Sequence, residues 1–159
     1  MIEFPSPNFA LRDRKPSFII IHGMCMESDD KCLETLCSEE LEVSCHYFID
    51  LNGELFKLVD EENIAWHAGV SYWRDLQGLN EYSIGIELSN PGVNEWLAYN
   101  EATYQTLIPL LQEIMERYDI PPENVLGHSD IAPDRKDDPS EHFDWARLEK
   151  LGLAFAKRR

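Results

Sequence analysis

The residues best suited to chemistry lie in one short stretch, residues 127–139, which reads Gly-His-Ser-Asp-Ile-Ala-Pro-Asp-Arg-Lys-Asp-Asp-Pro. It offers an imidazole at His128, several carboxylates and two adjacent cations, and its two prolines disfavour a continuous helix. Such a stretch is either a solvated turn whose charges face water or one part of a metal or catalytic site. Its composition alone favours the solvated turn, so the choice depends on whether the rest of the chain supplies matching groups.

A second candidate is His22, at the end of the run Ser-Phe-Ile-Ile-Ile-His over residues 17–22. Four consecutive apolar residues, three of them β-branched, predict a strand that is buried on both faces and central in a sheet. The carboxyl ends of such strands are where open α/β sheets bind their ligands. His22 can therefore be a metal ligand, or simply a hydrogen-bonded strand end.

A third candidate is Glu87, in the predicted strand over residues 82–88, Tyr-Ser-Ile-Gly-Ile-Glu-Leu. Aliphatic residues alternate with Ser83, Gly85 and Glu87, so one face of the strand belongs in the core. On the other face the small residues leave room beside the carboxylate for another group. A buried carboxylate is costly unless it is paired or lies near a cation, so Glu87 is either a paired structural residue or a functional one.

Two histidines and a carboxylate are a familiar ligand set for catalytic zinc, which keeps a fourth position open for water. His22, His128 and an aspartate of the 127–139 stretch could supply that set. Their separations along the chain form no motif, so spacing alone does not establish the site.

The elements that must position these groups predict an α/β fold with a central sheet flanked by helices. Turn and periodicity signals place helices over 28–41 and 101–118, with a kink or break at Pro109, and a tail helix over 143–158, interrupted near Gly152. Further strands are expected over 44–50, 54–59 and 125–126, and Leu51-Asn52-Gly53 predicts a hairpin between the first two. Residues 1–16 contain three prolines and predict an extended arm on a single domain that spans residues 1–159.

Residues 65–73, Ala-Trp-His-Ala-Gly-Val-Ser-Tyr-Trp, are an irregular segment rich in aromatic rings. Rings supply contact area at low entropic cost, so this segment can form a recognition wall for a ligand. It can equally be a loop that packs beneath the sheet.

The bulk composition limits the partners. With 30 acidic and 14 basic residues the chain has a formal net charge of −16 and no basic stripe, which argues against a nucleic-acid partner and against adhesion to a membrane or an anionic wall polymer. The amino terminus lacks a secretory pattern, and the four cysteines form no CxxC pair. We therefore expect a cytoplasmic monomer with free thiols, or a periplasmic protein if a signal segment has been removed.

Four segments, Ser44-Cys-His-Tyr, Trp66-His-Ala-Gly-Val-Ser, Ser83-Ile-Gly-Ile-Glu-Leu and Gly127-His-Ser-Asp-Ile-Ala-Pro, resemble the zinc-dependent N-acetylmuramoyl-L-alanine amidases. This family is related to the peptidoglycan recognition proteins and to the cytoplasmic muropeptide-recycling amidase. The resemblance runs in order over most of the chain. It implies a central mixed β-sheet flanked by helices, with a zinc cleft at one edge of the sheet.

The resemblance also implies roles for individual residues. One Zn²⁺ ion per chain would be held by His22, His128 and Asp138, with Glu87 as the catalytic glutamate and Lys136 as the cation beside the scissile amide. The implied reaction cuts the amide between N-acetylmuramic acid and L-alanine. Because muropeptides carry carboxylates, amides and hydroxyls, three polar residues are candidate substrate contacts: His67, Asn80 and Arg135.

Three other functions remain open at this stage. The chain could be a wall-lytic or prophage amidase that acts on intact peptidoglycan rather than a recycling enzyme for soluble muropeptides. It could be a non-catalytic peptidoglycan-binding module, although the presence of Glu87 and all three implied ligands argues against that. The metal site could also be purely structural.

Overall fold

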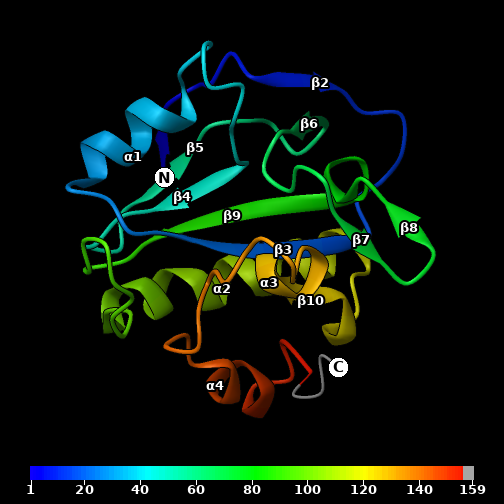
Figure 1. Cartoon of the computed structure of the whole chain (residues 1–159). Helices are drawn as coiled ribbons and strands as arrows, with labels where there is room; N and C mark the ends of the chain where they lie inside the picture. Colours follow the sequence, from blue (N-terminus) through cyan, green and yellow to red (C-terminus); the bar gives the residue numbers. More distant parts are fainter. Residues whose placement is uncertain (156–159) are drawn as a thin grey trace.

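The computed structural model describes residues 1–155 and places a six-stranded mixed sheet at the centre of the molecule (Figure 1). Four strands of this sheet run parallel to one another, and the other two run antiparallel to them. The predicted central mixed sheet with flanking helices is therefore confirmed. The spatial order is β1 (Ile2–Glu3), β5 (Leu55–Lys57), β4 (Tyr47–Ile49), β9 (Ser83–Ser89), β3 (Phe18–Met24) and β10 (Val125–Gly127).

One face of the sheet is covered by α2 (Glu101–Tyr118), with α4 (Trp145–Lys150) packed beyond it (Figure 1). The aliphatic face of β9 lies in this larger core, as its alternation predicts. Despite Pro109, α2 is continuous over 18 residues, so of the predicted kink or break the break is wrong. A proline removes one helical hydrogen bond, but the apolar stripe of α2 remains packed on the sheet, and packing of this kind supplies most of a helix's stability in a protein.

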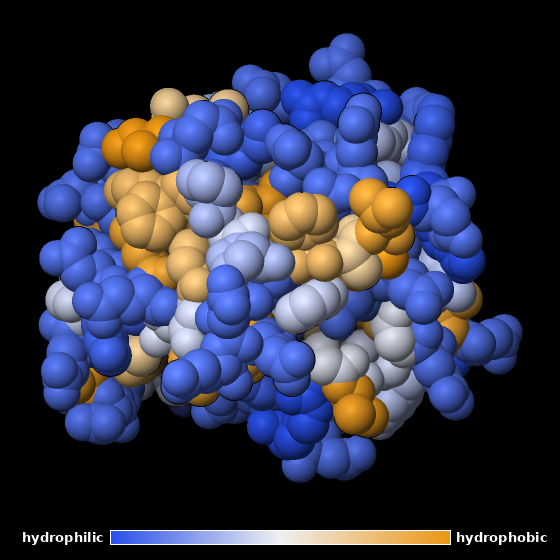
Figure 2. Space-filling model, turned by 90° about the horizontal axis from the view of Figure 1, so that it is seen from above, coloured by the Kyte–Doolittle hydropathy of each residue, from blue (hydrophilic) through white to orange (hydrophobic). Residues whose placement is uncertain are grey.

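The opposite face carries α1 (Asp29–Leu36), α3 (His128–Ile131) and two small two-stranded sheets. Seen from this side, apolar surface forms a broken band between hydrophilic side chains (Figure 2). The predicted amino-terminal arm contributes a strand to two different sheets, since β1 pairs with β5 and β2 pairs with β6. The small sheets consist of β2 (Phe9–Leu11) with β6 (Asn63–Ala65), and β7 (Tyr72–Trp73) with β8 (Leu76–Gln77).

Two predicted helices are shorter than their sequence patterns indicate. α1 begins where Ser28 accepts a hydrogen bond from the Lys31 backbone, but it ends at Leu36 rather than at residue 41. Its last turn has no basic residue, and acidic residues follow, so the negative end of the helix dipole is not compensated. α4 ends before Gly152, whose φ of 70° confirms the predicted interruption. Residues 156–158 of the predicted tail helix lie outside the described residues.

The other predicted elements are present with shifted ends. β4 and β5 form the expected hairpin, whose Gly53 has a φ of 82°, a value that glycine adopts without strain. The 127–139 stretch contains one short helix, α3, where the sequence predicts an irregular segment. Among the described residues no helix is both long enough and apolar enough to cross a membrane.

Candidate metal centre and active site

Three neighbouring parallel strands bring the candidate residues together at their carboxyl ends. His22 of β3 lies directly opposite Glu87 of β9 in the strand register, and His128 follows β10 immediately. Both His22 and Glu87 alternate with residues of the α2-side core, so their side chains face the opposite side of the sheet. Asp138 reaches the same place from the loop that follows α3.

His22, His128 and Asp138 form a buried triangle of donor atoms. The Nδ1 atoms of the two histidines are 2.9 Å apart, and Asp138 Oδ2 lies 3.1 Å from His128 Nδ1 and 3.4 Å from His22 Nδ1. Ligands on a tetrahedral zinc ion with bonds of about 2.0–2.1 Å are separated by roughly 3.3 Å. The three residues therefore fit a metal site in both chemistry and spacing, as the resemblance predicts.

Burial and hydrogen bonding set the charges of His22 and Asp138. Burial lowers the pKa of His22 to about 4, which leaves the imidazole neutral and able to bind a metal at neutral pH. Burial alone would raise the pKa of Asp138, but hydrogen bonds with His128 and His22 outweigh it and hold that pKa well below its usual range. A neutral His22 imidazole and an ionised Asp138 carboxylate are forms that bind a divalent cation.

Glu87 lies beside this triangle with only 12% of its side chain exposed. Its Oε1 is 3.9 Å from His22 Nδ1, and its Oε2 is buried without a hydrogen-bond partner within the described chain. Burial and then the charge of Asp138 raise the pKa of Glu87 well above its usual value, while Lys136 opposes the shift. A carboxylate with a raised pKa and an uncommitted oxygen is suited to accepting a proton.

A pocket of about 280 Å³ opens onto these residues. Its polar wall includes Glu87, His128, Asp138 and the exposed Lys136, so the lysine lines the same pocket as two of the candidate metal ligands. The remaining lining is mainly apolar and comes from β3, α1 and the segments around residues 43 and 66: Gly23, Met24, Met26, Leu36, Val43, Ser44, Trp66 and His67.

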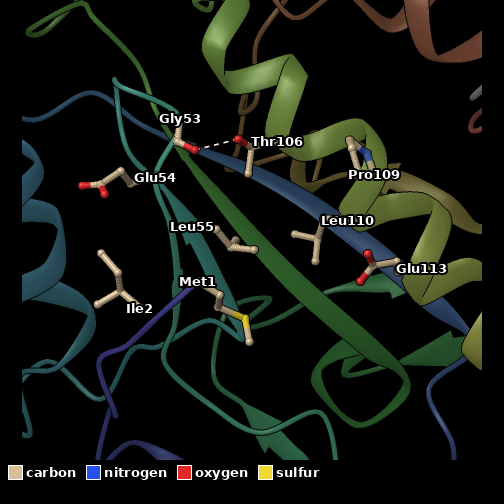
Figure 3. A pocket seen from close by; sticks show the side chains of 9 residues that line it. All are labelled: Met1, Ile2, Gly53, Glu54, Leu55, Thr106, Pro109, Leu110 and Glu113. Atoms are coloured by element: carbon tan, nitrogen blue, oxygen red, sulfur yellow. Dashed lines mark hydrogen bonds between the residues drawn. The ribbon is translucent and has the colours of Figure 1, made fainter.

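A larger cavity, of about 400 Å³, lies elsewhere, between α2 and the β4–β5 hairpin (Figure 3). Its wall contains a hydrogen bond from Thr106 to the Gly53 carbonyl, with Leu55, Pro109 and Leu110 nearby. The residues that line it include no histidine, lysine or arginine, so its volume alone does not make it the active site.

The three candidate substrate contacts bind the chain itself. His67 is buried, with Nδ1 2.9 Å from His22 Nε2. The Asn80 side chain accepts hydrogen bonds from the backbones of His67 and Ala68, and Arg135 donates to the carbonyls of Ala68 and Val70. Of the three, only His67 lines the pocket, and a role of any of them in substrate binding stays a prediction.

The structure adds residues that sequence reasoning missed. The Tyr99 hydroxyl donates to the Pro139 carbonyl over 3.0 Å, and the Trp96 indole donates to Asp137 over 3.0 Å. These bonds hold both neighbours of Asp138 from the segment after β9. The sequence predicts a strand over residues 82–88, but it carries no signal that the chain then returns to the candidate metal ligands.

A mixed α/β sheet that carries two histidines, an aspartate and a separate glutamate at one strand edge is the arrangement expected of a metal-dependent hydrolase. Residues 12–141 match the sequence model of one family, described as N-acetylmuramoyl-L-alanine amidase. The chain belongs to this family, which confirms the resemblance in its sequence.

Curated proteins similar to this chain are amidases as well. AmiD of Escherichia coli is 42% identical over 148 residues, which cover 85% of this chain and 52% of AmiD. The 1,6-anhydro-N-acetylmuramyl-L-alanine amidase AmpD of the same organism is 34% identical over 92% of this chain and 89% of its own length. The chain therefore spans about half of AmiD but most of AmpD.

Two solved structures also match this chain. A crystal structure of a selenomethionine AmpD derivative superimposes with a TM-score of 0.85 at 31% identity, covering 97% of this chain and 94% of that one. AmiD from E. coli in complex with the substrate anhydro-N-acetylmuramic acid-L-Ala-D-γ-Glu-L-Lys gives a TM-score of 0.81 at 40% identity, covering 89% of this chain and 59% of that one.

Proposed function

We propose that this chain hydrolyses the amide between the lactyl group of N-acetylmuramic acid and L-alanine in soluble muropeptides, with one zinc ion held by His22, His128 and Asp138. The observation that carries the proposal is the buried donor triangle with Glu87 beside it. The substrate class is supported by the anhydro-muropeptide bound to AmiD and by the name of AmpD.

The roles follow from chemistry. A zinc ion bound there supplies a Lewis acid that lowers the pKa of water from about 15.7 to about 7. Glu87 accepts the proton of the attacking water and later delivers it to the departing amine nitrogen, so that the amide becomes a free acid and a free amine. The Lys136 ammonium stabilises the negative charge that develops on the carbonyl oxygen, a contribution worth about 10²–10³ in turnover at comparable sites.

We further propose that the enzyme recycles soluble fragments in the cytoplasm, as a monomer, rather than degrading intact wall. All four cysteines are free thiols, as expected in a reducing compartment. The net charge of −16 repels anionic wall polymers but leaves a small substrate free to approach the local cation Lys136.

The test is a product analysis on two substrates. The zinc-loaded protein is incubated with 1,6-anhydro-N-acetylmuramyl-L-Ala-D-γ-Glu-L-Lys and, separately, with purified sacculi, and the products are identified by mass spectrometry. We expect the anhydro-sugar acid and the free tripeptide to form from the soluble substrate much faster than peptides are released from sacculi. Rapid release from sacculi alone would instead identify a wall-lytic enzyme, and no product from either would identify a binding module.

Chelation separates a catalytic metal from a structural one. Removing zinc with a chelator should abolish hydrolysis while the circular dichroism spectrum stays native, and added zinc should restore activity. Loss of the native spectrum on chelation would mean that the metal is structural.

A further inference from the structure

One dipeptide contacts the outer nitrogen of both histidine ligands. His22 Nε2 lies 2.9 Å from Nδ1 of His67, and His128 Nε2 lies 3.2 Å from the carbonyl oxygen of Ala68. The two metal histidines come from different strands, yet their second ring nitrogens meet consecutive residues of one loop.

These contacts determine which ring nitrogens carry hydrogen. The Nδ1 atoms of His22 and His128 face each other and Asp138, so they must be unprotonated to bind a metal, and each Nε2 must carry the hydrogen. The Ala68 carbonyl accepts from His128 Nε2, and His67 Nδ1 accepts from His22 Nε2, because each of those Nε2 atoms carries the hydrogen. The hydrogen on His67 Nε2 then points to the Ser83 hydroxyl at 3.3 Å, and that hydroxyl donates to the Leu79 carbonyl at 2.6 Å.

The dipeptide is itself held from several directions. Asn80 Oδ1 accepts from the backbone N–H of His67 over 3.0 Å and from that of Ala68 over 2.7 Å. Arg135 donates to the Ala68 carbonyl and, over 2.7 Å, to that of Val70. The His67 ring rests on Gly85, where a Cβ atom would overlap the imidazole.

We propose that the dipeptide His67–Ala68, anchored by Asn80, fixes the tautomer and orientation of both histidine ligands, which makes His67 and Asn80 positioning residues of the metal site. This inference rests on the proposed zinc site. It differs from a role in substrate contact, because it predicts a change in metal affinity without any substrate present. Outer-shell partners of metal histidines typically contribute a factor of about 10–100 in metal affinity.

The first test compares two variants of similar shape. In His67→Asn the side-chain oxygen can replace Nδ1 as the acceptor for His22, whereas His67→Leu has no acceptor. Zinc affinity is measured by competition with a chromophoric chelator, and the visible spectrum of the Co²⁺-substituted protein reports the ligand geometry. We expect His67→Leu to bind zinc about 10–100-fold more weakly with an altered Co²⁺ spectrum, and His67→Asn to recover most of the affinity and the wild-type spectrum.

A second pair keeps the inference testable if His67→Leu fails to fold. Asn80→Asp retains an acceptor for both backbone N–H groups and Asn80→Leu does not, so only Asn80→Leu should weaken zinc binding. If both Leu variants bind zinc as tightly as the wild type and only KM rises, the residues are substrate contacts and the inference is wrong. If the wild type itself binds no zinc, the proposed zinc site fails first, and this inference fails with it.

Discussion

The two faces of β9 are buried almost equally but are stabilised in different ways. Toward α2, the strand presents Ile84, Ile86 and Leu88, which are fully buried in the larger core. Toward the pocket, Ser83 is also fully buried, the His67 ring fills the space above Gly85, and Glu87 keeps one oxygen unpaired. Burial of apolar groups is favourable and non-directional, whereas burial of a polar group costs free energy unless the group has a hydrogen-bond partner.

The comparison shows how one strand combines stability with function. Packing on the α2 side can offset the cost of a buried carboxylate and of four buried histidines on the other side. Substitutions on the two faces of β9 should therefore have different effects on stability and on the site. Changes toward α2 should lower the free energy of unfolding and spare the site, and changes toward the pocket should impair the site and spare the fold.

The sharpest test on the pocket face is Glu87→Gln. It keeps the shape of the side chain but removes the proton acceptor, so we expect turnover to fall by about 10²–10⁴. Zinc affinity should be retained because Glu87 is not a ligand, and the free energy of unfolding should stay equal or rise, because a buried charge has been removed. Steady-state kinetics on a defined muropeptide measure the turnover, and urea unfolding measures the free energy of unfolding. Full turnover in this variant would exclude Glu87 as the general base.

The matching test on the core face is Ile86→Ala. Deleting a fully buried aliphatic side chain costs about 2–5 kcal/mol of unfolding free energy, through lost transfer energy and a residual cavity. At urea concentrations below its lowered unfolding midpoint, the variant should still bind zinc with nearly wild-type affinity. Loss of zinc affinity that matches the loss of stability would show that the two faces are not energetically separate.

The sequence predicts much of the division between the core face and the pocket face of β9, because a period of two assigns residues to faces wherever one face is apolar. The alternation at Ile84, Ile86 and Leu88 gives the core face, and the small Gly85 indicates space on the other. What fills that space is the ring of His67, 18 positions earlier in the chain, and no local pattern reports such a contact. The proposed metal ligands could be assigned only through resemblance to a family, since their spacing is set by the folded strands and not by a local motif.

A third substitution, Gly85→Ala, adds a methyl group on the pocket face. That methyl would overlap the His67 ring, so His67 should shift away from His22 and zinc affinity should fall by about 10–100-fold, or roughly 1.4–2.7 kcal/mol. The control is Ile84→Val, which removes a methyl on the core face and should lower the unfolding free energy by about 0.5–1.5 kcal/mol without affecting zinc. Unchanged zinc affinity in Gly85→Ala would mean that the His67 ring can move without consequence for His22.

The smallest effect expected concerns His46, a fully buried histidine on the pocket side of the sheet that is not a metal ligand. Its Nδ1 accepts from the Gly85 backbone over 2.9 Å, and its Nε2 lies 3.1 Å from the Asn63 carbonyl. Burial lowers the pKa of His46 to about 3; the Asn63 carbonyl opposes this shift, and the charge of Arg12 adds to it.

Because the folded-state pKa of His46 lies below the unfolded value of about 6.5, the unfolded chain takes up the proton first as pH falls. Its contribution to stability is therefore fully present above about pH 7 and is lost progressively from about pH 6.5 toward the folded-state pKa. Between pH 7 and pH 5.5 the loss from His46 alone should be about 1.3 kcal/mol. The variant His46→Asn keeps an acceptor for the Gly85 N–H but does not titrate, so its unfolding free energy should fall less between pH 7 and 5.5 by that amount. His22 and His67 titrate in both proteins, so the difference between the two curves reports the loss of His46 together with its effect on the neighbouring His67. Parallel curves would mean that His46 accepts a proton in the folded state as readily as in the unfolded one.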